Sequence, residues 1–108
     1  MIPDPAPPYD VSIVGRAQQD ILALLRRSKT HGLHAEVERL LYRVESELRF
    51  RPREWGDPLR NFRDAQTVQF RGKAAYVLAY YSVHERLPLV ILTSVSAPQG
   101  HPLSSPDG

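Results

Sequence analysis

The spacing of apolar residues changes several times along the chain, and each change predicts an element. Residues 9–14 alternate apolar and polar side chains, with β-branched types, as in a half-buried strand. After Gly15 the period becomes helical, with apolar residues at Ala17, Ile21, Leu24 and Leu25. Lys29–Gly32 closes this helix with a basic last turn and a glycine.

The second helix has the clearest pattern in the sequence. One apolar stripe extends over about four turns, and Pro52 ends it. Its opposite face predicts the ion pairs Arg43–Glu47 and Glu45–Arg49 at i,i+4 spacing. Because the linker to the first helix is short, we expect the two helices to be antiparallel neighbours. The stripe consists of Leu33, Val37, Leu40, Leu41, Val44 and Leu48.

The helical period is absent after Pro52. Residues 55–59 are typical of a turn, and residues 67–71 alternate as in a strand that ends at a tight turn over Gly72–Lys73. Residues 74–83 and 89–95 are rich in β-branched and aromatic residues and predict two further strands, with a turn over 84–87. The prediction is an α+β fold. An N-terminal strand and an antiparallel helical hairpin precede a three-stranded antiparallel meander, the strands form one four-stranded sheet, and the hairpin covers one face.

The two ends of the chain differ from its centre in composition. Residues 1–8 form a proline-rich segment without the apolar stretch of a secretory signal, and residues 98–108 combine Pro, Gly, Ser and Asp. We therefore expect an N-terminal tail over 1–8, a single domain over 9–97 and a flexible C-terminal tail over 98–108. No apolar run approaches the ~18 residues of a membrane span. Cysteine is absent, which fits a reducing cytoplasm.

Four features follow in order along the chain, an opening strand over Tyr9–Ile13, two helices ending in Leu48, the loop Arg53–Arg60 and the strand Ala75–Val83. This combination resembles the RelE/ParE superfamily of toxins from type II toxin–antitoxin systems, and the RelE-like branch above all. The resemblance covers residues 9–96. It implies a cytoplasmic toxin with an antitoxin protein as partner. RelE-like members cut messenger RNA on the ribosome without a metal or other cofactor.

The resemblance also implies the chemistry of a catalytic site. The RNA 2′-hydroxyl attacks the adjacent phosphate, so the site must accept a proton, stabilise negative charge and protonate the leaving 5′-oxygen. Arg71 and Lys73 would stabilise the charge, and His101 would donate a proton. The alternatives are that the two cations are simply solvated beside a turn and that His101 is an inert tail residue. This sequence departs from the family at Val77, where an arginine is usual, and in the uncharged stretch 96–101.

Basic residues are concentrated between residues 49 and 73. This segment holds seven Lys or Arg residues against three Asp or Glu, whereas the whole chain has a net charge of only +2. A local basic zone suits nucleic acid or an acidic protein segment, and it also keeps a small domain soluble. Trp55 is either a partner anchor or a packing residue. The candidate residues for contact with RNA or a partner are Arg49, Arg51, Arg53, Arg60, Arg63 and Trp55.

Several other functions lack sequence support. His31, His34 and His84 do not have metal-ligand spacing with a second cluster, so no metal site is predicted. The sequence contains no Walker loop and no nucleophile elbow. Tyr76, Tyr80 and Tyr81 could stack on bases, although at least one should belong to the core. Two further functions remain open, a catalytically inactive protein-interaction module on the same fold and a ParE-like inhibitor of DNA gyrase.

Overall fold

The computed structural model describes residues 7–104, so all but two residues of the expected N-terminal tail over 1–8 lie outside the described part of the chain. Three helices and five strands follow in the order β1 (Asp10–Ile13), α1 (Gly15–Thr30), α2 (His34–Phe50), α3 (Pro52–Trp55), β2 (Asp57–Phe62), β3 (Thr67–Ala74), β4 (Val77–His84) and β5 (Leu89–Ser96). Within this part of the chain, no helix has both the length and the apolar composition needed to cross a bilayer.

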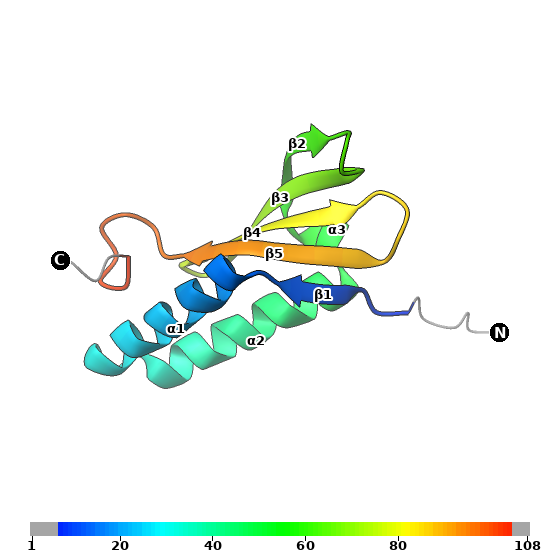
Figure 1. Ribbon diagram of the computed structural model, residues 1–108. Coiled ribbons are helices and arrows are strands. Elements are labelled where there is room, and N and C mark those ends of the chain that lie inside the picture. The colour runs from blue at the N-terminus through cyan, green and yellow to red at the C-terminus, as the bar shows by residue number, and fades with distance from the viewer. Residues whose placement is uncertain (1–6, 105–108) are drawn as a thin grey trace.

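The strands form one sheet with the order β1-β5-β4-β3-β2. The pairs from β2 to β5 are antiparallel, whereas β1 lies parallel to β5 at the sheet edge. Helices α1 and α2 lie side by side on one face of this sheet (Figure 1). The predicted α+β class, the helical hairpin and the β3–β5 meander are therefore confirmed.

The predicted number of strands is wrong, because residues 57–62 form a fifth strand, which includes residues 57–59 of the predicted turn. Strand β2 pairs with β3 in antiparallel register at the sheet edge. All six of its side chains are exposed, so it carries no apolar alternation that a sequence pattern could detect. Pro58 favoured a turn, yet proline is tolerated on an edge strand. The residues before it, Pro52–Trp55, form the short helix α3, with the proline in its first turn.

The predicted turn at Gly72–Lys73 is also wrong. Both residues lie inside β3, and the hairpin turn occurs at Ala75–Tyr76, between the paired residues Ala74 and Val77. Gly72 is needed in the strand because a Cβ atom there would lie 2.2 Å from the Trp55 ring. The glycine at position 72 therefore reflects close packing and not a turn. A sequence pattern does not distinguish between these two reasons for a glycine.

The hydrophobic core lies between the helices and the sheet. Leu24, Val37, Val44 and Leu48 from the two long helices are buried against β4 and β5 side chains such as Val83. The apolar spacing of both helices therefore faces the sheet as predicted. Of the two predicted ion pairs on α2, Glu45–Arg49 is present at 3.2 Å, while Glu47 pairs with Arg51 at 3.8 Å instead of with Arg43.

Aromatic side chains fill the core beside α3. The Tyr81 ring stacks between Trp55 and Phe70, with ring centroids 5.8 Å and 5.5 Å away. The Tyr81 hydroxyl donates a hydrogen bond of 2.5 Å to the Pro52 carbonyl oxygen. Burial raises the pKa of this hydroxyl well above its ordinary value, and the nearby carboxylates of Glu47, Asp57 and Glu54 raise it further.

The C-terminal segment is described as far as residue 104, and there it folds back on the domain. Leu103 is fully buried in the core, although the predicted domain boundary was residue 97. The Arg27 guanidinium donates a hydrogen bond of 2.7 Å to the Leu103 carbonyl oxygen. The core thus includes a residue of the segment that was expected to be a flexible tail.

Candidate functional site

One face of the sheet carries no helix formed by residues 7–104, and strand alternation places the predicted cations on it. On β3, Phe70, Gly72 and Ala74 are buried towards the helices. Because successive side chains point to opposite faces of a strand, Arg71 and Lys73 lie on the helix-free face. Both are exposed. Figure 1 shows α1 and α2 together on the opposite side of the sheet.

Strand register brings polar side chains from β4 and β5 next to these cations. Arg71 pairs with Tyr80, Tyr80 pairs with Ser94, and Lys73 pairs with Leu78. The neighbours of Tyr80 in β4 are fully buried, so its own side chain lies on the helix-free face. Directly paired residues in an antiparallel sheet have Cβ atoms about 4.5–5.5 Å apart. We call Arg71, Lys73, Tyr80 and Ser94 the open-face site.

The open-face site combines two positive charges with two hydroxyl groups. Neither Arg71 nor Lys73 takes part in a salt bridge among the described residues, although Asp57 is the cross-strand partner of Arg71 on β2. The cations therefore remain available to an anion. A guanidinium and an ammonium group stabilise phosphate charge, and a phenol can transfer a proton. Tyr80 and Ser94 were not predicted as catalytic residues, because their position beside Arg71 depends on register.

His101 lies beside Tyr76, which is in the turn between β3 and β4. Its ring stacks on Tyr76 with 4.1 Å between centroids, and the Tyr76 hydroxyl donates a hydrogen bond of 3.0 Å to Glu36 on α2. Burial raises the pKa of Tyr76, and the bond to Glu36 raises it further. His101 Nδ1 accepts a hydrogen bond of 3.1 Å from the Leu103 N–H. Arg71 and Lys73 therefore share one face of β3, whereas the contacts of His101 are with Tyr76 and Leu103.

The departure at Val77 has a structural explanation. Val77 is fully buried on the helix-covered face, so an arginine at this position would point away from Arg71 and Lys73. The adjacent residue on the helix-free face is Leu78, the direct partner of Lys73. The strand thus offers an apolar side chain where a further cation would complete the open-face site.

The basic residues predicted to bind RNA or a partner do not form one surface. Arg49 and Arg51 lie at the end of the α2 layer and pair with Glu45 and Glu47. Arg53 donates a hydrogen bond of 2.6 Å to the His84 carbonyl oxygen. These three arginines therefore have structural partners at the helical side of the domain.

Arg60 and Arg63 lie at the β2 edge of the sheet. Arg60 on β2 pairs with Gln69, so its side chain shares the helix-free face with Arg71. Its guanidinium carbon lies 5.9 Å from the centroid of the exposed Phe62 ring, a cation–π arrangement. Arg63 lies in the turn between β2 and β3. Arg60 thus extends the positive charge of the open-face site towards the sheet edge.

Trp55 is held mainly by packing. Its ring stacks on Tyr81 and lies against the backbone of Gly72. This contact supports β3 from the helix-covered face at the residue that separates Arg71 from Lys73. Of the two interpretations of Trp55, a packing residue therefore agrees with its position better than an exposed partner anchor.

The histidines do not form a metal centre in the described part of the chain, where no group of three potential ligands comes together. His34 Nδ1 lies 2.8 Å from the Glu38 carboxylate one helical turn away. His84 Nδ1 accepts hydrogen bonds from the backbone N–H groups of Arg86 and Leu87, both 3.0 Å long. These contacts stabilise local structure.

Comparison with known proteins identifies the fold. No sequence model of a protein family and no curated protein matches the chain. A chain of the archaeal RelE–RelB complex from Pyrococcus horikoshii OT3 matches with a TM-score of 0.60 and 18% identity, over 86% of this chain and 97% of that chain. A chain of the toxin–antitoxin complex RelBE2 from Mycobacterium tuberculosis matches with a TM-score of 0.52 and 21% identity, over 89% and 98%. The protein therefore has the fold of RelE-like toxins.

Proposed function

We propose that this protein is the toxin component of a type II toxin–antitoxin pair and acts in the cytoplasm. The proposal is supported by the similarity to chains from two toxin–antitoxin complexes along nearly their whole length. An antitoxin protein is then the expected partner. The observation that carries the proposal is the open-face site, where two cations without a salt bridge to residues 7–104 lie beside a tyrosine on the helix-free face of the sheet.

The activity that this site supports best is metal-independent cleavage of messenger RNA on the ribosome. The 2′-oxygen of one nucleotide forms a bond to the adjacent phosphorus and loses its proton, while the bond from phosphorus to the 5′-oxygen breaks and that oxygen gains a proton. The products are a 2′,3′-cyclic phosphate and a free 5′-hydroxyl. Arg71 and Lys73 stabilise the negative charge that increases on the phosphate oxygens in the transition state.

Proton transfer is assigned to Tyr80 first and to His101 second. Tyr80 is the direct cross-strand partner of Arg71, so a phosphate bound by the guanidinium would lie near the phenol. His101 is the second candidate because its ring stacks on Tyr76 and its Nδ1 accepts a hydrogen bond from the Leu103 N–H. Arg60 would bind the RNA backbone beyond the scissile phosphate, and its neighbour Phe62 offers a ring for base stacking.

The remaining predicted binding residues support the antitoxin contact better than the RNA contact. Arg49, Arg51 and Arg53 lie on the helical side, away from the helix-free face. An acidic segment of an antitoxin could reach them without covering the open-face site.

Growth and translation after induction of this chain alone test the proposal. We expect rapid arrest of amino-acid incorporation, and we expect Arg71→Ala with Lys73→Ala to relieve it. The matched control is Arg26→Ala with Lys29→Ala, which removes the same two charge types from exposed positions on α1. Arrest with translation initially intact would indicate a gyrase-type target, and normal growth with a folded protein would contradict toxin activity.

A second function, a catalytically inactive interaction module, is favoured by two specific observations. Val77 and Leu78 leave the start of β4 without a cation, and His101 contacts Tyr76 and Leu103. In this case the folded wild-type chain would bind its protein partner but would not cleave messenger RNA. Calorimetry with a candidate antitoxin, together with a cleavage assay of the wild-type chain, separates this function from RNA cleavage.

A further inference from the structure

A cavity of about 400 Å³ lies on the helix-covered side, near the β1 edge of the sheet and remote from the open-face site. Nine aliphatic side chains from β1, α1, α2 and β5 line it, among them Val11 and Ile13, Ile21 and Leu25, and Leu41. We call it the helix–strand cavity. Its volume is in the range of about 300–1,000 Å³ typical of pockets that bind small molecules.

The two ends of the layer between the helices and the sheet differ in their side chains. Aliphatic side chains line the cavity at the β1 end, and aromatic rings pack at the α3 end. Beside α3, the rings of Trp55, Tyr81 and Phe70 stack on one another. Beside β1, the lining is aliphatic and opens to solvent between Ile13, which is 40% exposed, and Tyr42, which is 69% exposed. An apolar molecule can therefore enter from solvent and displace water from an apolar wall.

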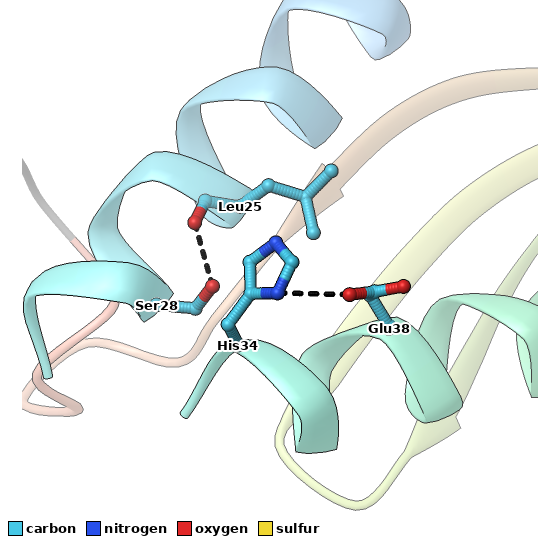
Figure 2. Close-up of polar contacts among 4 residues, drawn as sticks. All are labelled: Leu25, Ser28, His34 and Glu38. Carbon is cyan, nitrogen blue, oxygen red and sulfur yellow. Dashed lines mark hydrogen bonds and ion pairs between the residues drawn. The ribbon is translucent and has the colours of Figure 1, made fainter. Parts of the chain in front are cut away.

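All the polar residues of the lining come from α2. They are His34, Glu38, Tyr42 and Glu45, and no lysine or arginine lines the cavity in the described part of the chain. In Figure 2 the His34 ring lies between the Leu25 side chain and the Glu38 carboxylate, with 2.8 Å between Nδ1 and Oε1. Glu45 is likewise fixed by Arg49 at 3.2 Å. The two carboxylates are seven residues apart, which is about 10.5 Å along one side of the helix.

We call the four polar residues from α2 the rim of the cavity. The rim favours one charge of ligand over the other. Each carboxylate has one partner and further lone pairs free for a donor. A cationic head at the rim would gain a charge-assisted hydrogen bond, whereas an anionic head would meet two carboxylates against a single arginine, the Arg49 partner of Glu45. Because the side chains of Glu38 and Glu45 are about half exposed, at 47% and 52%, the apolar body supplies most of the affinity and the rim mainly the preference.

We propose that the helix–strand cavity binds a small amphipathic cation, an apolar chain or ring that carries an ammonium group. The apolar body lies between β1, α1 and α2, and the ammonium group donates to Glu38 or Glu45. This site is independent of the proposed RNA cleavage, because its lining shares no residue with the open-face site.

Three probes with the same eight-carbon chain test the proposal: octylamine, 1-octanol and octanoate, each titrated into the ¹⁵N-labelled full chain at pH 7.5. We expect changes in the amide chemical shifts of residues that line the cavity. The dissociation constant of octylamine should be roughly threefold below that of octanol and tenfold below that of octanoate, and a tenfold difference corresponds to about 1.4 kcal/mol. Equal affinity for the three probes, or shifts confined to other regions, would overturn the proposal.

Two sets of variants locate the binding. Leu41→Trp fills the cavity and should abolish the shifts, while Leu40→Trp adds the same ring at a half-buried position of α2 outside the lining and should not. If Leu41→Trp does not fold, Ile13→Trp blocks the entrance from β1. Glu38→Gln with Glu45→Gln should bring octylamine to the affinity of octanol, whereas the control Glu47→Gln with Glu54→Gln should keep the preference. Unchanged octylamine binding in the filled or the neutralised cavity would contradict the site.

Discussion

The two faces of the sheet are built from consecutive residues of the same strands, yet they have opposite properties. On the covered face, Gly72 and Tyr81 pack against α3 and tolerate little change. On the helix-free face, Arg71 and Lys73 are exposed and make no salt bridge among the described residues. A shift of one residue along β3 therefore separates a position that stabilises the fold from one that serves the site. Substitutions at neighbouring positions should change stability and activity independently.

The largest effect is expected at the start of β4, where an arginine can be placed on either face. Val77→Arg buries a charge without a partner and should lower the free energy of unfolding by about 4 kcal/mol or prevent folding. Leu78→Arg, one residue later, lies on the helix-free face and should cost less than about 1 kcal/mol. Urea unfolding measures both. Similar losses for the two variants would contradict the assignment of the faces.

Gly72→Ala tests the support that the covered face gives to β3. The added Cβ atom would lie 2.2 Å from the Trp55 ring, so we expect the free energy of unfolding to fall by about 1–3 kcal/mol. In a Trp55→Ala background the same change should cost much less, as a double-mutant cycle would show. Gly15→Ala is the control, because no atom lies within 4 Å of its added Cβ. Equal losses in both backgrounds would indicate that the ring does not constrain Gly72.

Tyr81→Phe removes a buried hydrogen bond and leaves the Pro52 carbonyl oxygen without its donor. We expect a loss of about 1–3 kcal/mol at neutral pH. Because burial raises the pKa of Tyr81 in the folded state, the unfolded chain ionises first and stability should fall as the pH rises above about 10. Urea unfolding from pH 8 to pH 11 should show a smaller alkaline decline in the variant. An identical decline in both proteins would contradict the raised pKa.

The smallest effect is expected at the turn that joins the two strands of the site. Ala75 has a φ of +52°, a conformation that costs a non-glycine residue about 1–2 kcal/mol. Ala75→Gly removes this cost at some loss of chain entropy, so we expect a gain of up to about 1 kcal/mol. The thermal unfolding midpoint should rise while the open-face site is unchanged. A lower midpoint would show that the alanine is not strained.

Elements with regular apolar spacing could be predicted from the sequence. The neighbours of a residue could not be predicted where they depend on the register of paired strands. The α2 stripe and the β5 run identify buried elements because their apolar spacing is long and uniform. Strand β2 was missed because all its side chains are exposed. For the site, Arg71 and Lys73 were predicted as the residues that stabilise phosphate charge. The place of Tyr80 beside Arg71 depends on strand pairing, and the position of His101 depends on the fold of the C-terminal segment. One sequence contains no signal for either.

The most direct test of the central claim is cleavage of a ribosome-bound messenger RNA in a purified translation system. We expect the wild-type chain to produce fragments with 2′,3′-cyclic phosphate ends, and Arg71→Ala with Lys73→Ala to reduce the rate by at least about 100-fold with unchanged stability. Tyr80→Phe should reduce it by about 100-fold or more as well, whereas the Arg26→Ala, Lys29→Ala control should cleave normally. Cleavage that continues without Arg71 and Lys73, or a folded wild-type protein that cleaves nothing, would contradict the account.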